Sequence, residues 1–433
     1  MTRIVILGSG MAGCGADHRL RESGLRAVMY EQSSQGGGHT RTHEFDGGWL
    51  FDEGPHVSFT KDTRIQQLLA ESVDGAYRIH HANVDNYWRG YWIKHPVQCN
   101  LHGLPDDIVV SCLKDFIDTN SRSSLPVTNY AEWLVETYGS TFAETFPMEY
   151  AKKVHTTTAA NLTTDWLGPR LYRPSLEEVL RGAISRQTSD FHYVKEYRYP
   201  DRGGYSAYLR PFLQRADLRP DHRLVQVDPR RQALTFGSGT EEPYDHLISS
   251  VPLPDFVPMI VGAPDDVLQA AGRLAATSLV LVNIGIDRED IGDTWTYFYD
   301  QDIVFARVSY PHRLSPNMAP PGCGSLQCEI YLSDKYKPRT EPPEAFIERS
   351  IEDLRKCGLI EERDTILHKS AIHVPYANII HDHDKAVALD LVRGYLEELG
   401  IRMCGRYGLW GYQWTDEAFI SGETAALELI DSL

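Results

Sequence analysis

Three glycines near the N-terminus have the spacing that brings a backbone close to a phosphate. Gly8, Gly10 and Gly13 follow an apolar run at 2–7, and a helical pattern follows them. In such a turn the first glycine allows the sharp bend, the second admits the phosphate, and the third lets helix and strand pack closely. The helix N-terminus would then face a pyrophosphate, and Glu31, which ends a second apolar run, would hold a ribose hydroxyl pair. The opening segment therefore predicts a dinucleotide site.

A second glycine run and the C-terminal segment indicate which dinucleotide is bound. Residues 35–42 contain three consecutive glycines soon after Glu31, where the backbone can closely approach a bulky ligand. Residues 405–412 form a glycine-rich and aromatic loop, and 416–426 predict a helix with small residues on one face. These segments together resemble the flavin amine oxidase superfamily, in which both chain ends build one FAD domain. The resemblance implies that the last helix points its N-terminus at the flavin pyrimidine edge, where reduced flavin is negative.

The cofactor implied by this resemblance is FAD. Its reduced form would be the active one, and NAD(P)H is a candidate reductant. The residues placed against FAD are Gly8, Gly10, Met11, Ala12, Gly13, Glu31, Gln32, Gly37, Gly38, His39, Thr40, His56, Val227, Gly405, Arg406, Gln413, Trp414 and Ala418.

The composition describes a large, acidic, globular protein. A chain of 433 residues is too long to fold around one simple hydrophobic core, so two or three domains are expected. The formal net charge of -17, without a basic block, argues against nucleic acid as a partner. The cysteines are scattered and no apolar run is long enough to cross a bilayer, so we expect a cytoplasmic protein with reduced thiols and no membrane partner. A homodimer is kept open.

No metal site is expected. Residues 381–384 read His-Asp-His-Asp, which invites a metal interpretation. Adjacent positions seldom converge on one ion, so a polar turn is the better interpretation.

The elements that carry these residues predict an α/β fold. It would combine a Rossmann-like FAD-binding domain, built from both chain ends, with a helical insert and an antiparallel β-sheet substrate domain. Helical periodicity dominates 104–185, whereas the apolar runs between 277 and 332 suit an antiparallel sheet. We place the FAD domain in 1–100, 200–275 and 385–433, the helical insert in 101–199, and the sheet domain in 276–384.

Several local sequences resemble the UDP-galactopyranose mutase family. His56 completes a Gly-Pro-His motif whose histidine lies against the flavin in that family. Arg307 lies on a strand where the mutases place a diphosphate-binding arginine, and Tyr376 follows a proline, as does a tyrosine that contacts the same diphosphate. Packing at a strand end is the other interpretation of Tyr376. Arg406 and Tyr412 match the final active-site loop. The resemblance therefore implies that these five residues are catalytic.

The substrate side is predicted from the same resemblance and from residue type. Tyr150 lies on the helix that offers a tyrosine to the nucleotide, although a core position is the alternative. His155 stands near the position where mutases stack a tryptophan on uracil, which leaves base and sugar open. The basic segment 168–174 would either bind phosphate or form a solvent-exposed loop. The full set of predicted substrate contacts is Trp92, Tyr150, His155, Arg170, Arg173, Tyr199 and Trp410.

The reaction implied by the resemblance is a pyranose–furanose ring rearrangement of a sugar nucleotide, with reduced flavin as the nucleophile and no net redox change. A departing diphosphate needs fixed cations, and the planar fork of arginine suits phosphate oxygens. We therefore predict that Arg307 and Arg406 converge above the flavin ring. Two alternatives stay open: an FAD-dependent oxidoreductase of the amine oxidase or protoporphyrinogen oxidase type, and an FAD-binding protein without catalysis.

Overall fold

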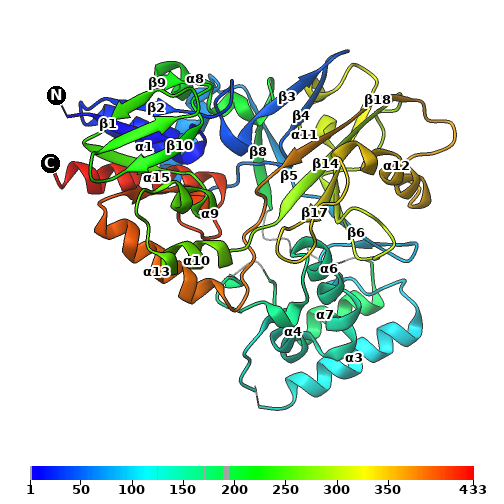
Figure 1. The fold of residues 1–433 in the computed structure, drawn as a ribbon. Coiled ribbons are helices and arrows are strands. Elements are labelled where there is room, and N and C mark those ends of the chain that lie inside the picture. The colour runs from blue at the N-terminus through cyan, green and yellow to red at the C-terminus, as the bar shows by residue number, and fades with distance from the viewer. Residues whose placement is uncertain (1, 124, 169–170, 187, 189–190, 192–194) are drawn as a thin grey trace.

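A five-stranded parallel sheet forms the centre of the nucleotide domain (Figure 1). The computed structural model describes residues 2–123, 125–168, 171–186, 188, 191 and 195–433. The order β19-β13-β1-β2-β9 joins strands from both ends of the chain, and every neighbouring pair is parallel. Its strands are β1 (Ile4–Leu7), β2 (Ala27–Tyr30), β9 (Asp217–Arg219), β13 (His246–Ser249) and β19 (Arg402–Met403). Since both faces of β1 are covered, its residues are continuously apolar, as expected for a central parallel strand.

Two helices from opposite ends of the chain pack closely against one face of this sheet. α1 (Met11–Glu22) and α15 (Thr415–Ile430) meet at glycines, because a larger residue would not fit. A Cβ on Gly422 would lie 1.9 Å from the carbonyl oxygen of Ala12, and one on Gly15 would lie 2.1 Å from that of Phe419. The predicted domain made from both chain ends is therefore confirmed.

The opposite face of the sheet carries a second hydrophobic core. A three-stranded antiparallel sheet and a layer of helices enclose it. These elements are β10 (Leu224–Asp228), β11 (Ala233–Phe236), β12 (Glu241–Pro243), α9 (Leu253–Phe256), α10 (Asp265–Arg273) and α13 (Lys385–Glu398).

The second domain is built on a seven-stranded sheet of order β18-β14-β17-β16-β15-β6-β7. Neighbouring strands are antiparallel except β15 and β6, which pair in parallel. The predicted antiparallel sheet is thus present, but the sequence had placed residues 84–94 in the FAD domain. Its elements are β6 (Val84–Trp88), β7 (Tyr91–Lys94), β14 (Ser278–Ile286), β15 (Trp295–Phe298), β16 (Arg307–Ser309), β17 (Gly324–Leu332) and β18 (Ile366–Val374), with α11 (Pro311–Leu314) and α12 (Phe346–Lys356).

The helical insert forms a separate lobe beside this sheet (Figure 1). It consists of α3 (Asp106–Asn120), α4 (Tyr130–Tyr138), α5 (Ser140–Thr145), α6 (Pro147–Val154) and α7 (Leu176–Ile184). Asn129 caps α4 by accepting a bond from the Glu132 N–H, and Ser175 forms a capping box with Glu178 at the start of α7. The lobe ends before β8 (Glu196–Pro200), which pairs with β5 (Tyr77–His81).

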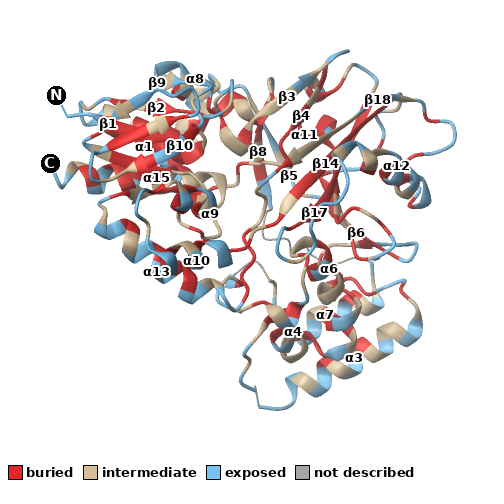
Figure 2. Cartoon of the chain, in the orientation of Figure 1, coloured by how far each residue is buried: buried red, intermediate tan, exposed pale blue. Residues whose placement is uncertain are grey.

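Shorter elements complete the fold. They are the hairpin of β3 (Thr42–Phe45) and β4 (Trp49–Asp52), and the helices α2 (Thr63–Ser72), α8 (Arg210–Arg215) and α14 (Gly405–Gly408). Buried residues are concentrated on the large sheets and on the inner faces of the helices (Figure 2). Across the described ranges, no helix combines the length and apolar content that a bilayer crossing requires.

Candidate active site

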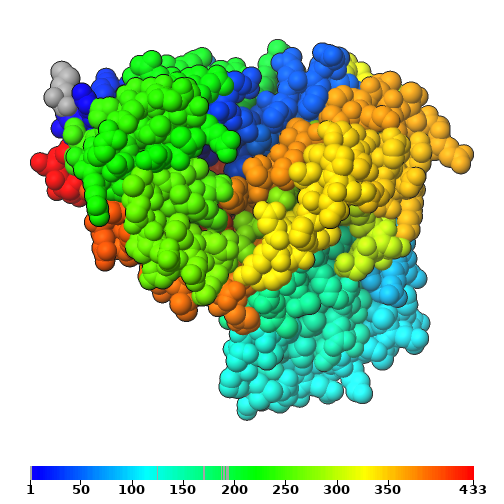
Figure 3. Space-filling model, in the orientation of Figure 1, coloured from blue at the N-terminus to red at the C-terminus, as the bar shows by residue number. Residues whose placement is uncertain are grey.

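A cavity of about 1280 Å³ lies where the nucleotide domain, the sheet and the helical insert meet. Figure 3 shows the surface hollowed between the nucleotide domain and the yellow and orange segments of the sheet domain. Most of the residues predicted from sequence line this one cavity. They are Gly8, Gly10, Met11, Ala12, Glu31, Gln32, Gly37, Gly38, His39, Thr40, His56, Tyr150, His155, Arg307, Tyr376, Gly405, Arg406, Tyr412, Gln413, Trp414 and Ala418.

The two glycine runs form one edge of the cavity. Gly8 has a φ of +96°, which favours glycine, and it directly follows β1. A Cβ on Gly38 would lie only 3.0 Å from the Cα of Gly10, so the two runs approach each other closely. α1 starts immediately after Gly10 with no side-chain cap, which leaves its first N–H groups for an anion. This edge fits a pyrophosphate.

Glu31 lies at the end of β2, beside that edge. It is 7% exposed, and it accepts hydrogen bonds from the Ser9 N–H at 3.1 Å and the Ser9 hydroxyl at 2.6 Å. Its other oxygen accepts from the Ser33 N–H at 3.0 Å. These bonds hold the carboxylate at the cavity, the position that the motif predicts for a ribose partner.

Glu53 is a lining residue that the sequence interpretation missed, although it directly precedes the Gly-Pro-His motif. Arg41 contacts its carboxylate at 2.8 Å and His43 at 2.9 Å, while His39 lies 3.6 Å away. Burial alone would raise the pKa of Glu53, but nearby His39, the hydrogen bond with His43 and the charge of Arg41 outweigh it and hold that pKa far below its usual range. Glu53 thereby ties the second glycine loop to the cavity.

Arg406 organises the C-terminal loop. Its Nε and Nη2 donate to the Gln413 carbonyl at 2.9 and 2.5 Å, and Nη1 donates to the Ala377 carbonyl at 3.0 Å. The guanidinium also lies over the Tyr412 ring, 5.0 Å from its centroid. In the described part of the chain no carboxylate forms an ion pair with it. The loop therefore brings a cation to the cavity whose charge is not neutralised.

Arg307 reaches the same cavity from β16, but its charge is paired. Its Nε and Nη2 donate to the two oxygens of Glu329 at 2.6 and 2.8 Å. Glu329 lies on the neighbouring β17 with a side chain that is 1% exposed, and Tyr331 donates its hydroxyl to it. Such a two-point pair fixes the plane of the guanidinium. The structure thus brings the two predicted arginines to one cavity, and it adds Glu329, which no local motif revealed.

Tyr376 and Tyr412 also line the cavity. Burial and the nearby Asp255 carboxylate raise the pKa of Tyr376, so its hydroxyl stays protonated. Its ring lies 5.5 Å from that of Tyr407. Tyr412 packs its ring 5.4 Å from Trp414. The two tyrosines therefore add aromatic rings and hydroxyl groups to the cavity, and the Tyr412 ring lies against Arg406.

Aromatic side chains form the side of the cavity contributed by the helical insert. The Tyr150 ring packs edge-on against Tyr297 and Tyr299, at 5.4 and 5.8 Å. His155 packs 5.1 Å from Trp166, which also lines the cavity. Trp166 was missed because it lies in a loop outside the helix where the resemblance placed a tryptophan. Because His155 stands where the mutases have a tryptophan, the sequence could have prompted a search for a tryptophan nearby.

Comparison with known proteins decides the family. The sequence profile of the flavin-containing amine oxidoreductases matches residues 11–430. The chain belongs to this family. A flavin is therefore its cofactor, and the uncapped α1 and the paired glycine runs fit the phosphates of a flavin nucleotide.

Solved structures share this fold along the whole chain. A reduced UDP-galactopyranose mutase superposes with a TM-score of 0.93 at 23% identity, covering 100% of this chain and 96% of the other. A protein assigned as a protoporphyrinogen oxidase from Exiguobacterium gives 0.77 at 16%, covering 100% and 99%. A fatty acid isomerase from P. acnes that produces CLA gives 0.66 at 12%, covering 99% and 98%. At these identities the likeness shows the fold alone.

His56 lines the cavity with its ring held by one hydrogen bond. Its Nδ1 lies 2.9 Å from the Gly54 carbonyl, and since a carbonyl can only accept, Nδ1 carries the proton. Burial, helped by the charge of Arg406, lowers the pKa of His56 from 6.5 to about 4. The ring is therefore neutral at pH 7, with an unprotonated Nε2. Such an acceptor suits an N–H group on the ligand.

The lowered pKa of His56 predicts a pH dependence of stability. Below pH 6.5 the His56 side chain binds a proton in the unfolded chain, whereas in the folded chain it binds one only near pH 4. The free energy of unfolding therefore falls as the pH drops through that window. Replacing His56 by Gln should make the acid-side slope of the unfolding free energy shallower by about 1 kcal/mol per pH unit. Urea titrations of both proteins between pH 4 and 7 measure this, and parallel slopes would show that His56 titrates normally.

Four predicted contacts lie elsewhere. Tyr199 is fully buried on β8, where its hydroxyl donates to Asp52 at 2.5 Å. Trp92 is 46% exposed on β7, away from the cavity. Trp410 is fully buried in the core behind the loop, and Val227 is buried there too, because it pairs with Leu234 inside the three-stranded sheet. These predictions were wrong, since aromatic type and strand position do not reveal which side a residue faces.

The remaining predicted residues have other positions. Arg173 is exposed over the Trp133 ring at 4.8 Å rather than in the cavity, and Arg170 lies outside the described residues. Gly13 lies behind the cavity lining, where a Cβ would meet the Gly8 oxygen at 2.0 Å, so it serves helix–strand packing as its motif predicts. Within the described ranges, no three or more His, Cys, Asp or Glu side chains are grouped to hold a metal ion.

Proposed function

We propose that this protein is an FAD-dependent sugar-nucleotide mutase that interconverts pyranose and furanose rings without net redox change. The observation that carries the proposal is that Arg307 and Arg406 line the same cavity as a complete dinucleotide-binding edge. An oxidase that removes hydride from a neutral amine has no need of two arginines there. A sugar nucleotide, whose diphosphate carries two negative charges in an acidic protein, has that need.

The dinucleotide form of the flavin is supported by the extent of the cavity. It runs from the edge formed by Gly8 and Glu31 to His56 and the C-terminal loop, and Arg223 and Leu224 line it as well. Glu31 would hold the adenosine ribose, and the N–H groups of α1 would hold the pyrophosphate. When bound and reduced, the flavin would supply a nucleophile for the anomeric carbon of the sugar.

The side chains of this protein would hold and release the diphosphate. Arg406 brings an unneutralised cation, and Arg307 brings a guanidinium whose plane Glu329 fixes. Tyr376 would hold phosphate oxygens through its hydroxyl without adding charge. Neutral His56 would accept an N–H of the reduced ring. The chain therefore positions both charge and ligand before reaction, which is the contribution required when the cofactor performs the chemistry.

Turnover by the reduced holoenzyme tests this function. Photoreduced, anaerobic enzyme is incubated with UDP-galactose and a panel of other sugar nucleotides, and products are separated by chromatography. We expect one of them to form its other ring isomer while the flavin stays reduced, with NAD(P)H able to replace light as the reductant. An absence of isomers from the whole panel, together with bleaching of oxidised flavin by an amine or alcohol, would instead identify an oxidoreductase.

A further inference from the structure

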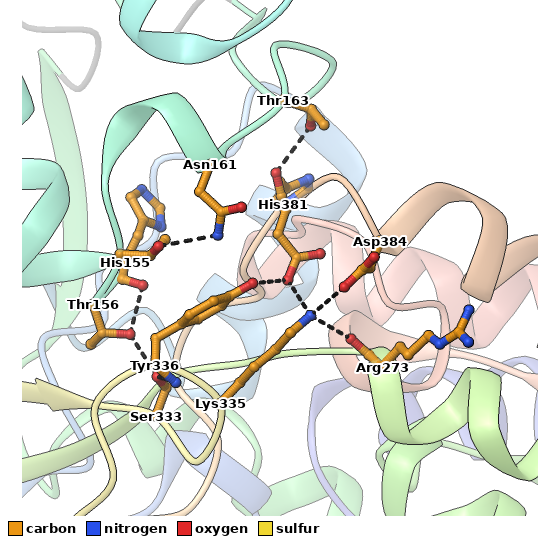
Figure 4. Close-up of polar contacts among 12 residues, drawn as sticks. His155, Thr156, Asn161, Thr163, Arg273, Ser333, Lys335, Tyr336, His381 and Asp384 are labelled. Carbon is orange, nitrogen blue, oxygen red and sulfur yellow. Dashed lines mark hydrogen bonds and ion pairs between the residues drawn. The ribbon is translucent and has the colours of Figure 1, made fainter.

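Three parts of the chain meet next to the cavity, behind the residues that line it (Figure 4). The hairpin after β17 carries Lys335, whose Nζ donates to Asp382 and to Asp384, both at 2.8 Å. The same Nζ donates to the Arg273 carbonyl at the end of α10, at 3.3 Å. Tyr336 donates its hydroxyl to Asp382 at 2.7 Å. We name Lys335, Tyr336, Asp382 and Asp384 the junction cluster.

The junction cluster is held by a buried charge. Asp382 is 1% exposed, so its carboxylate has exchanged water for Lys335 and Tyr336. Burial opposes the charge of Lys335, but hydrogen bonds to Asp382 and Asp384 outweigh it and raise the pKa of this lysine above its usual range. Breaking one side of such a pair leaves an uncompensated charge in the interior, which is strongly destabilising locally. The hairpin and the segment before α13 are therefore firmly joined.

One arm of the cluster leads to Trp166. The carbonyl of His381, next to Asp382, accepts hydrogen bonds from the Thr163 N–H at 2.8 Å and its hydroxyl at 3.1 Å (Figure 4). The Trp166 Nε1 donates to the Thr163 carbonyl at 2.8 Å, and its ring packs 5.7 Å from His381. The position of Trp166 at the cavity thus depends on where Asp382 holds the His381 backbone.

A second arm leads to His155. Thr156, which follows it, has a φ of +58° and a hydroxyl 2.7 Å from the hydroxyl of Ser333 (Figure 4). Ser333 begins the hairpin that carries Lys335, and its hydroxyl accepts from the Tyr336 N–H at 3.1 Å. His155 and Trp166, which contact each other in the cavity, are therefore each fixed to a different side of the same cluster.

We propose that the junction cluster is a positioning device that holds His155 and Trp166 at the cavity and so sets the affinity for the nucleotide end of the substrate. The identity of that ligand rests on the proposed function. The described lining of the cavity includes no member of the cluster, so the cluster acts on the ligand indirectly, through the bonds that connect it to these two aromatic side chains. The two rings meet edge-on, at an interplanar angle of 62°, and together they offer the cavity an aromatic surface that suits a nucleotide base.

The test uses FAD-loaded enzyme carrying Lys335→Met, with Tyr336→Phe as a milder variant and Lys335→Arg as a rescue. Lys369→Met is the matched control, because it breaks an exposed lysine–glutamate pair with Glu348 in the same domain. Hydrogen exchange of residues 155–166 is measured without ligand. UDP affinity is measured by titration, with kcat and KM where turnover is observed.

The Lys335→Met and Tyr336→Phe variants should exchange faster in residues 155–166 but not in α1 or α15. Their UDP affinity should fall by about threefold to thirtyfold, and where turnover is observed KM should rise while kcat stays unchanged. Lys335→Arg should keep the hydrogen exchange of 155–166 and the UDP affinity at wild-type values, and Lys369→Met should change neither. Unaltered exchange in 155–166, or unaltered affinity in an enzyme that binds UDP, would overturn the proposal. If the unmodified enzyme binds neither UDP nor any other nucleoside diphosphate tested, the proposed function fails on its ligand, while hydrogen exchange still decides whether the cluster positions residues 155–166.

Discussion

Replacing Arg307 by alanine should lower kcat/KM for a sugar nucleotide by about a hundredfold to a thousandfold in FAD-loaded enzyme. The loss of kcat/KM should exceed the loss expected from removing an unpaired arginine, because Arg307 and Glu329 form a neutral pair at the cavity. Truncating the arginine exposes the diphosphate to an unpaired buried carboxylate, which repels it. Steady-state kinetics with the flavin kept reduced measure the effect.

Glu329 provides the matched control for this prediction. In the double variant Arg307→Ala with Glu329→Gln, the repelling charge is also removed, so part of the lost kcat/KM should return. With Glu329→Gln alone completing the cycle, the coupling should be about 1–3 kcal/mol. Flavin content, read from the absorbance spectrum, should be normal in all four proteins. Wild-type kinetics in Arg307→Ala would show that this arginine does not contact the reacting ligand.

A single methyl group on Gly422 should destabilise the fold by about 3 kcal/mol or more. The Cβ would lie 1.9 Å from the Ala12 carbonyl, so α15 must move away from α1. That movement shifts the N-termini of both helices, which face the flavin cavity, and should also weaken flavin retention. Urea unfolding and the flavin content of purified Gly422→Ala measure the two effects.

Gly394 is the natural comparison for Gly422. It is exposed inside α13, and a Cβ there would meet no atom within 4 Å. Gly394→Ala should therefore stabilise the protein by about 0.5–1 kcal/mol, because alanine gives up less backbone freedom than glycine in a helix. If both glycine variants unfold at the same urea concentration, the close contact between α1 and α15 at Gly422 is contradicted.

Local patterns in the sequence predicted the parts of the fold that depend on neighbouring residues. Helix α2 is defined by such local signals, because Asp62 caps it and its apolar residues repeat at helical spacing. The glycine motif after β1 and the contribution of the C-terminal segment to the same domain likewise followed from short, well-characterised signals.

Features that depend on distant segments were not predictable in this way. Strands β6 and β7 join the large sheet only because β6 pairs with β15, far along the chain. Glu329 matters because β16 lies beside β17, and Trp166 because residue 381 holds its loop. Aromatic side chains were the least predictable, since Tyr199 and Trp410 fill the core as readily as they would line a pocket.

The central claim is that Arg307 and Arg406 together bind a diphosphate beside the flavin. Titration of reduced, FAD-loaded enzyme with UDP and with uridine tests it most directly, since the two ligands differ only in that group. Charge-assisted hydrogen bonds from two arginines predict that UDP binds at least about a hundredfold more tightly, and that Arg307→Ala removes most of the difference. Equal affinity for UDP and uridine would contradict the account.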